Sequence, residues 1–223
     1  SYFQDCAVVD SLFRAYVVHG TNSTRVSRNV AYNVLGMAYY LEDGVEEHNV
    51  LEYNLAAHVH PIYRPADGGW GQGGETFPRR QQDGSYVPAD TRELLIPADT
   101  SASGFYALNA NNEWVGNAAS GGWSGFAFPN APATIGAFLG ADTSSPQTRP
   151  LKRFYGNTAH STGFYWGGHG SGVYVGARLH MQDGRLVYNS GRHARDTVDD
   201  AGEDSWMVFE HTKVFQSHKG ISH

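Results

Sequence analysis

Short runs of β-type residues recur along the chain, each ending in an asparagine and, in several copies, followed by a glycine and another β-type run. In the first copy, the run at residues 30–33 leads to Gly36 and a second run at residues 38–41. The asparagines that end the runs are Asn33, Asn54, Asn117, Asn157 and Asn189. Asn54 lies 21 residues after Asn33, close to one coil of a solenoid, and the longer later intervals indicate insertions. The pattern predicts a right-handed parallel β-helix.

Strands this short are not stable alone, so each coil must stack on its neighbours at about 4.8 Å per step. An asparagine at each corner accepts left-handed backbone geometry and can bond to the asparagine of the next coil. The asparagines expected near one edge are Asn54, Asn117, Asn157 and Asn189. Gly36 and Gly44 fit corners at which a Cβ would clash. The alternative is a β-sandwich with chance Asn-Gly turns, but a sandwich does not need asparagine at one place in every unit.

Three segments interrupt the repeat. Residues 61–98 are rich in proline, glycine and charge, residues 129–150 contain four prolines, and residues 192–205 are polar and acidic. Such segments are typical of loops that leave one face of a solenoid, where binding surfaces usually lie. Because no linker divides the chain, we expect one β-helix domain over residues 1–223.

The composition agrees with β structure and narrows the possible partners. Glycine (27), tyrosine (13) and phenylalanine (11) are plentiful. The net charge is −6, and no basic stripe of the kind that binds nucleic acid is present. No apolar run is long enough to insert into a membrane. The single cysteine, Cys6, excludes an internal disulfide and is expected to be a small buried residue.

An acidic turn surrounds Gly44. Its carboxylates are Glu42, Asp43, Glu46 and Glu47. Glu42, Asp43 and Glu46 are candidates both for binding Ca²⁺, which takes several oxygen ligands, and for acid–base catalysis on a sugar. The alternative is a solvated corner in which one carboxylate caps backbone N–H groups of the adjacent coil; no calcium-loop spacing is met.

Among eleven histidines, His160 is the remaining catalytic candidate, because it lies beside Ser161 just after a corner asparagine. His58 and His60 alternate on one strand face. A metal site there needs further ligands from other coils. Structural or surface histidines are therefore the favoured interpretation.

The glycine-rich run at residues 68–74 lacks the Lys-Ser/Thr ending of a phosphate loop. It contains Trp70 instead, and the face of an aromatic ring can bury the apolar surface of a sugar ring. The predicted carbohydrate-binding residues are Trp70, Tyr63, Tyr86 and Arg79. The alternative is that these aromatics pack on the solenoid wall.

Asn22-Ser23-Thr24 is an N-glycosylation sequon, typical of a surface turn in a secreted protein. A second acidic stretch, at residues 196–204, also offers carboxylates for Ca²⁺, although a solvated loop is favoured.

Residues 29–46 resemble the β-helix region shared by the cell-migration-inducing hyaluronidases, their transmembrane relative and the fibrocystin-like surface proteins. The other matching segments are residues 103–106, 112–119 and 157–161. The resemblance covers most of residues 1–175 and implies a β-helix and an extracellular or cell-surface setting. Met37 stands where relatives often carry histidine, and these 223 residues do not contain the strand-rich companion domain of the hyaluronidases. The resemblance therefore implies hyaluronan cleavage only weakly.

Two functions follow from these patterns. The favoured one is a structural or adhesive module of a glycoprotein coat, appendage or filament, with glycans among its partners. The alternative is an enzyme or binding protein acting on an acidic polysaccharide such as hyaluronan. The chain opens at Ser1 as a mature protein or excised segment would. Strand-like sequence at residues 2–9 and 219–221 predicts neighbouring protein at both solenoid ends, unless an excursion folds back over them.

Overall fold

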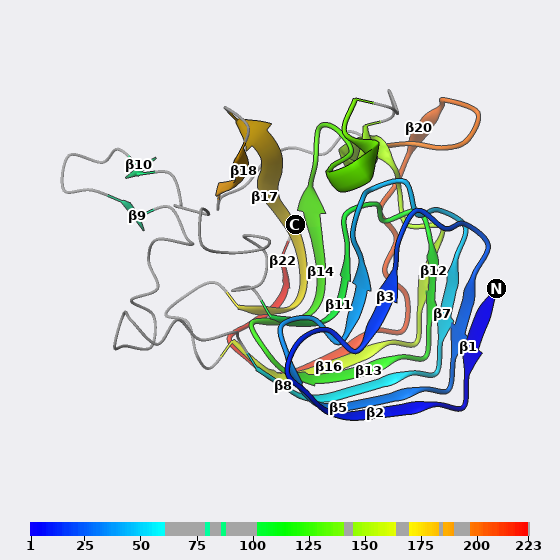
Figure 1. The fold of residues 1–223 in the computed structure, drawn as a ribbon, viewed down its shortest axis with the longest axis vertical. Coiled ribbons are helices and arrows are strands. Elements are labelled where there is room, and N and C mark those ends of the chain that lie inside the picture. The colour runs from blue at the N-terminus through cyan, green and yellow to red at the C-terminus, as the bar shows by residue number, and fades with distance from the viewer. Residues whose placement is uncertain are drawn as a thin grey trace.

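The computed structural model describes residues 1–60, 102–140, 145–163, 170–182, 185–189 and 197–222, together with short strands at residues 79–80 and 86–87. The strands stack into a parallel β-helix, which confirms the predicted fold class (Figure 1). Helix in the described residues comprises two single 3₁₀ turns, η3 (Gly136–Phe138) and η4 (Pro146–Thr148). The described residues contain no helix that is long and apolar enough to cross a membrane.

Each full coil contributes one strand to each of three sheets. The first coil contains β1 (Tyr2–Gln4), β2 (Ala7–Ser11) and β3 (Tyr16–Val18), and the second contains β4 (Arg25–Ser27), β5 (Val30–Leu35) and β6 (Tyr39–Leu41). The third contains β7 (Val50–Glu52), β8 (Leu55–His60) and β11 (Ser103–Ala107), and the fourth contains β12 (Glu113–Val115), β13 (Ala118–Gly121) and β14 (Ser124–Asn130). The fifth contains β15 (Arg153–Tyr155), β16 (Thr158–Thr162) and β17 (Ser171–Gln182), and β21 (Lys213–Ser217) and β22 (Lys219–Ser222) follow it. Sheet A has the order β1-β4-β7-β12-β15, sheet B β2-β5-β8-β13-β16-β21, and sheet C β3-β6-β11-β14-β17. At its last strand, sheet C pairs parallel with β22 and antiparallel with β18 (Arg185–Asn189).

The strand register gives the true length of a coil. Ala7 pairs with Val30, and Val30 pairs with Leu55, so coils without an insertion are 23 and 25 residues long. This is longer than the 21-residue spacing from Asn33 to Asn54, because those two asparagines do not occupy equivalent places in their coils.

A ladder of buried asparagines forms the corner between sheets A and B. Its rungs are Asn29, Asn54, Asn117 and Asn157. Each Oδ1 accepts a backbone N–H from the preceding coil at 2.9–3.0 Å. Each Nδ2 donates to a carbonyl of that coil at 2.8–3.0 Å. The ladder therefore satisfies polar backbone groups that the corner removes from water.

Three of the four asparagines expected near one edge lie in this ladder, and the expectation is wrong for the fourth. Asn189 pairs with Arg178 in the antiparallel β17–β18 pair. Asn33 also lies outside the ladder, within β5, where its Nδ2 donates to Asp10 Oδ1 at 2.8 Å. Its φ is 54°, so the left-handed backbone explains the asparagine there.

Left-handed residues recur once per coil in two columns. The first column lies at the corner between sheets A and B and consists of Asp5, Arg28, Tyr53, Gly116, Gly156 and His211. The second lies within the strands of sheet B and consists of Asp10, Asn33, His58, Gly121, Ser161 and Gln216. Each residue of the second column interrupts the strict in–out alternation of its strand, so that two successive side chains, such as those of Tyr32 and Asn33 in β5, are both at least partly exposed.

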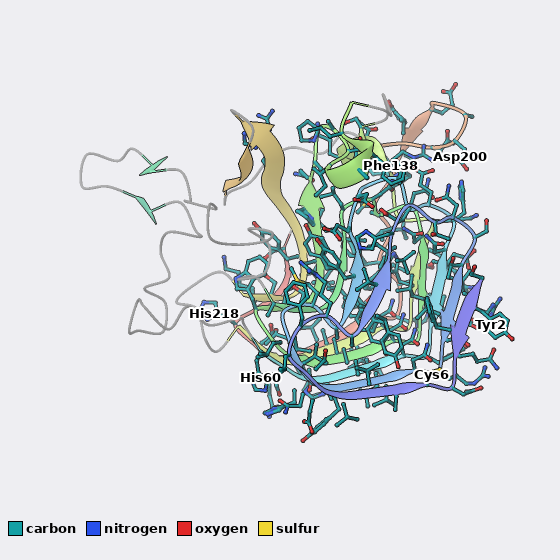
Figure 2. All side chains as sticks on the ribbon, viewed as in Figure 1. Tyr2, Cys6, His60, Phe138, Asp200 and His218 are labelled. Atoms are coloured by element: carbon teal, nitrogen blue, oxygen red, sulfur yellow. The ribbon has the colours of Figure 1, made fainter. Side chains whose placement is uncertain are left out.

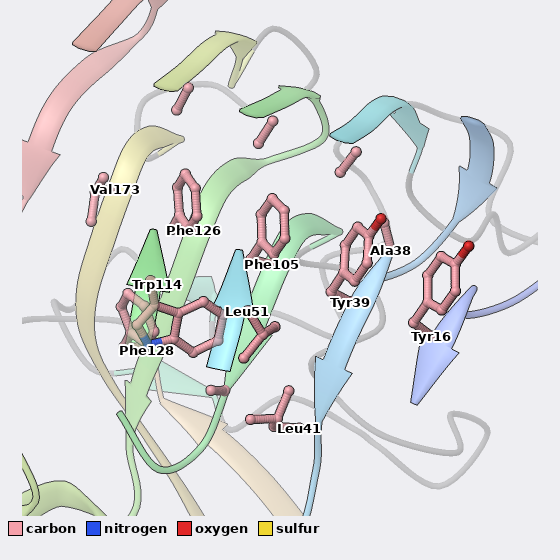
Figure 3. Close-up of a cluster of buried hydrophobic side chains, with 14 of the residues drawn as sticks. Tyr16, Ala38, Tyr39, Leu41, Leu51, Phe105, Trp114, Phe126, Phe128 and Val173 are labelled. Carbon is pink, nitrogen blue, oxygen red and sulfur yellow. The ribbon is translucent and has the colours of Figure 1, made fainter. Parts of the chain in front are cut away.

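The core is made of like side chains stacked from coil to coil (Figure 3). Along the inner face of sheet C, the rings of Tyr16, Tyr39, Phe105 and Phe126 stack with centroids 4.8, 4.6 and 4.8 Å apart. Each such pair contributes about 0.5–1.5 kcal/mol beyond burial of its area. The inner face of sheet B is lined with alanines, which leaves room for the aromatics opposite. Those alanines are Ala31, Ala56, Ala119 and Ala159.

The predicted excursions differ in extent from their sequence bounds. The first two residues of 129–150 still belong to β14, and the remainder that is described packs on the turn joining sheet C to sheet A. There a Cβ on Gly44, whose φ is 91°, would lie 2.7 Å from Pro146 Cγ, so the position requires glycine. Gly36 likewise has a positive φ, 82°.

The segment 192–205 contains an antiparallel pair, β19 (Thr197–Val198) and β20 (Asp204–Ser205). The segment 61–98 lies outside the described residues except for the paired strands β9 (Arg79–Arg80) and β10 (Tyr86–Val87). The expectation for Cys6 is wrong: it is exposed, because it lies in the first coil and no described coil stacks beyond it.

Candidate functional site

The acidic turn (residues 42–47) joins sheet C to sheet A between β6 and β7. Glu46 lies at its centre and is fully buried. Its Oε1 accepts the N–H groups of Gly20 at 2.8 Å and Asp43 at 3.1 Å, and its Oε2 accepts the N–H of Gly44 at 2.8 Å. Burial raises the pKa of the Glu46 carboxyl, and these N–H groups oppose that rise. Glu46 thus ties the turn of the first coil to that of the second.

Glu42 and Asp43 share one histidine from the first coil. The imidazole nitrogens of His19 lie 3.1 Å from Glu42 Oε2 and 3.2 Å from Asp43 Oδ2. Asp43 is buried, and its carbonyl accepts the N–H of Ile135 at 3.0 Å. A Cβ on Gly136 would collide with the Asp43 carboxylate, so the segment after β14 closes over this side chain.

Glu47 completes the turn through an arginine from the same segment. Arg149 Nε and Nη2 donate to its two carboxylate oxygens at 2.6 and 3.1 Å, and Asn109 Nδ2 donates at 2.8 Å. Arg149 also pairs with Asp200, at the exposed tip between β19 and β20. The hydrogen bond from Arg149 holds the pKa of the Asp200 carboxyl below its ordinary value. Figure 2 shows Asp200 and Phe138 at this end of the coils.

Of the three candidate Ca²⁺ ligands in the turn, Glu46 has both carboxylate oxygens engaged by the backbone. Calcium takes six to eight oxygen ligands, whereas both oxygens of Glu46 already accept backbone N–H groups. Within the described residues, the metal-binding side chains that converge are instead Glu47, His48 and Asp200. Arg149 bonds both of those carboxylates, and Lys152 Nζ lies 3.3 Å from His48 Nδ1. Two cations already occupy that cluster, so its charge favours ion pairing over metal binding.

His160 lies far from the acidic turn, on the outer face of sheet B. Its Nδ1 is 3.0 Å from Ser161 Oγ, and its ring stacks on Phe215 at 4.7 Å and 7°. The acidic turn joins sheets C and A, so the four catalytic candidates do not form one constellation. The rings of His58 and His60 are in contact, with centroids 3.9 Å apart. Burial lowers the pKa of His60, and the charge interaction with the neighbouring His58 lowers it further.

The predicted carbohydrate-binding residues fall largely outside the described part of the chain. Trp70 and Tyr63 lie outside it, and Arg79 and Tyr86 are placed only as members of β9 and β10. Asn22 is exposed, and its Oδ1 accepts the N–H of Glu47 at 2.9 Å. N-glycosylation uses the amide nitrogen, so this bond is compatible with a glycan.

Sequence reasoning missed the partners that hold the carboxylates. His19 and Arg149 lie 24 and 102 residues from the acidic residues that they contact. No local motif links them, and only the coil register brings them together. The ladder residue Asn29 could have been found, because it lies 25 residues before Asn54, one coil away.

The comparisons with known proteins agree with this architecture. A family model described as CEMIP beta-helix matches residues 1–166. In Dictyostelium discoideum, protein rliB is 47% identical over 231 residues, covering 100% of this chain and 19% of the relative. A G8 domain-containing protein of the same organism is 46% identical over 225 residues, covering 99% of this chain and 19% of the relative. Fibrocystin-L of Mus musculus is 32% identical over 172 residues, covering 74% of this chain.

The chain therefore spans less than a fifth of the length of these relatives, and 3% of fibrocystin-L. The matched residues include the asparagine ladder, the acidic turn and the first five strands of sheet B. With the family model covering well over half of the chain, the protein belongs to the CEMIP beta-helix family.

Proposed function

We propose that this chain is a structural or adhesive β-helix module of an extracellular protein. The observation that carries the proposal is the engagement of the acidic turn. Glu46 holds three backbone N–H groups, Glu47 holds Arg149, and Glu42 shares His19 with Asp43. A glycosidase needs two carboxyl groups facing the bond that it cleaves. Carboxylates tied to backbone and to cations of their own chain support a role in holding coils together instead.

Family membership and the exposed sequon support the extracellular setting. Asn22 lies on the surface of the turn between the first two coils. In protein secreted from a eukaryotic host, we expect treatment with an N-glycosidase to remove mass. The Asn22→Gln variant should carry no such mass, and an unmodified wild-type chain would count against this setting.

Neighbouring protein at the solenoid ends is part of the same proposal. In the described residues, β1, β2 and β3 each end their sheets. Tyr2 and Leu12 in that coil are 75% and 85% exposed. Bare strand edges recruit further strands, either from another part of a longer chain or from a neighbouring copy. Light scattering after gel filtration tests self-association, and a stable monomer with both ends covered by its own loops would exclude it.

The competing function, cleavage of an acidic polysaccharide such as hyaluronan, is tested directly. We expect high-molecular-mass hyaluronan to keep its size, measured by size-exclusion chromatography, after incubation with the chain. A reference hyaluronidase serves as the positive control. A fall in polymer length that Glu42→Gln or His160→Ala abolishes, with both variants folded, would replace the module proposal with an enzymatic one.

A further inference from the structure

The three sheets differ in what their outer faces offer to a ligand. On sheet C, the outward Tyr40 and Tyr106 are buried at 0% and 1% exposure. On sheet A, the outer face carries charge, including the ion pair of Arg25 with Glu52. The outer face of sheet B is different, because it is exposed and largely uncharged. Along its outward positions in the described strands, the Asp, Glu, Lys and Arg side chains are Asp10 in the first strand and Lys213 in the last, and the histidines are His58, His60 and His160.

Two aromatic pairs lie on this face. Tyr32, 48% exposed, stacks on His58 with ring centroids 5.9 Å apart and an interplanar angle of 22°. His160 stacks in the same manner on Phe215, which is 50% exposed. The positions of Tyr32 and His160 are three strands apart, since the order is β5-β8-β13-β16. At about 4.8 Å per step, this separation is about 14 Å.

Small side chains fill the face between the two pairs. Ala57 in β8 is the register partner of Tyr32, and Ser120 in β13 is the partner of His160. Gly121 follows Ser120 at the left-handed position of β13. The surface between the two aromatic pairs therefore projects less far from the sheet than the rings on either side of it. Ser120, Ser161 and Asn33 supply neutral hydrogen-bonding groups beside the rings, and all three are partly exposed.

We propose that the outer face of sheet B binds an uncharged oligosaccharide that lies along the solenoid axis from the Tyr32–His58 pair to the His160–Phe215 pair. Sugar rings present apolar C–H faces that pack on aromatic side chains, while their hydroxyls bond to neutral polar groups. The described strands of this face carry no row of lysines or arginines to pair with carboxylates, so their charge complements a neutral glycan better than an acidic one. The site is distinct from the acidic turn and does not depend on the module proposal.

Two alternatives use the same face differently. A protein partner would also bury its aliphatic residues Val30 and Leu55, which are 37% and 40% exposed. An acidic polysaccharide would bind through the few cations available and would be released by salt. The spacing of two ring pairs over a small-residue floor favours the sugar, and the experiment separates all three.

The test is a titration of the whole chain, followed by amide NMR shifts, with cellohexaose, chitohexaose, mannohexaose and a hyaluronan hexasaccharide. We expect saturable binding of at least one of the three neutral sugars. Tyr32→Ala and His160→Ala should each weaken it by about three- to tenfold, the loss of one stacking contact. Tyr32→Phe, which keeps the ring, should retain it. The matched control is Tyr53→Ala, which removes a tyrosine that is 61% exposed at the neighbouring corner and should leave binding unchanged.

Four results would overturn the proposal. The first is the absence of binding by every neutral sugar at millimolar concentration. The second is binding that both alanine variants leave intact while they remain folded by circular dichroism. The third is preference for the hyaluronan hexasaccharide with loss of binding at high salt. The fourth is self-association that Tyr32→Ala abolishes in a chain that binds no sugar, which would assign the face to a protein.

Discussion

The acidic turn and the outer face of sheet B use polar groups in opposite ways. In the turn, Glu46 is fully buried and each of its oxygens is hydrogen-bonded within the chain. On the face, Tyr32 and Phe215 remain about half exposed, and the neutral polar groups beside them reach solvent. A dense cluster of charges therefore marks a structural joint, whereas the surface free to meet a ligand carries little charge. Burial and bonding distinguish the two roles, and residue type alone does not.

The largest expected effect is that of removing the Glu46 carboxylate, which lies at the centre of the acidic turn. Glu46→Ala removes the acceptor of the N–H groups of Gly20, Asp43 and Gly44, and leaves those of the buried residues Asp43 and Gly44 without a partner inside the turn. We expect the free energy of unfolding to fall by roughly 3 kcal/mol, measured by urea denaturation. Glu203→Ala, which changes an exposed glutamate, is the control and should stay within about 0.5 kcal/mol of wild type. Equal, small effects would mean that the turn is not a joint.

The asparagine ladder offers a second, somewhat smaller test. Asn117→Ala removes the acceptor of the Asn54 N–H and the donor to the Leu51 carbonyl, both inside the corner. We expect a loss of about 2 kcal/mol in the free energy of unfolding. Asn33→Gly retains the left-handed backbone of β5 and alters a more exposed side chain, so it should cost about 0.5 kcal/mol or less. If the two substitutions cost the same, the buried ladder has no special role.

On the outer face of sheet B, a substitution should weaken sugar binding without lowering the stability of the fold. Tyr32→Ala removes a half-exposed ring and leaves the core stacks untouched. We therefore expect the unfolding free energy to change by about 0.5 kcal/mol or less, in thermal and urea melts run on the protein used for the sugar titration. A loss as large as that of Asn117→Ala would show that the ring serves the fold and would remove the contrast between the two regions.

The smallest expected effect concerns Asp200, which pairs with Arg149 at the exposed tip between β19 and β20. Arg149 lowers the pKa of Asp200 from its ordinary value of 3.8. The stabilisation from this pair is therefore present above about pH 3.8 and is lost as the pH falls through the lowered value. Because Asp200 is exposed, we expect only a slight difference in Tm between wild type and Asp200→Asn at pH 6. The difference should shrink as the pH falls below 3.8, and a difference that grew on acidification would contradict the assignment.

The fold was predictable because its repeat consists of residues with strong backbone preferences. Asparagines recur where a coil turns, and β-type runs separate them. The exact register was harder, since Asn29 and Asn33 flank the same run, one in the buried ladder and the other at a left-handed position in β5. Both places favour asparagine for different reasons. Sequence spacing therefore suggested a coil of 21 residues where the register has 23 to 25.

The site was less predictable because its contacts cross coils. The four carboxylates were visible as a cluster, but the partners that engage them are His19 and Arg149, which enter only through stacking and through the segment after β14. The outer face of sheet B was hidden for a related reason. Its aromatics are single residues in separate strands, and they form pairs only when the parallel register sets β5 beside β8 and β16 beside β21.

Amide hydrogen exchange measured by NMR tests most directly whether the acidic turn is a structural joint. If the turn is a structural joint, the N–H groups of Gly20, Asp43 and Gly44 exchange nearly as slowly as core amides such as that of Tyr39. Glu46→Gln should speed their exchange. Fast exchange of all three in the wild-type chain would mean that the turn is not a joint, because the Glu46 carboxylate would then be free to bind a ligand or to act as a catalyst.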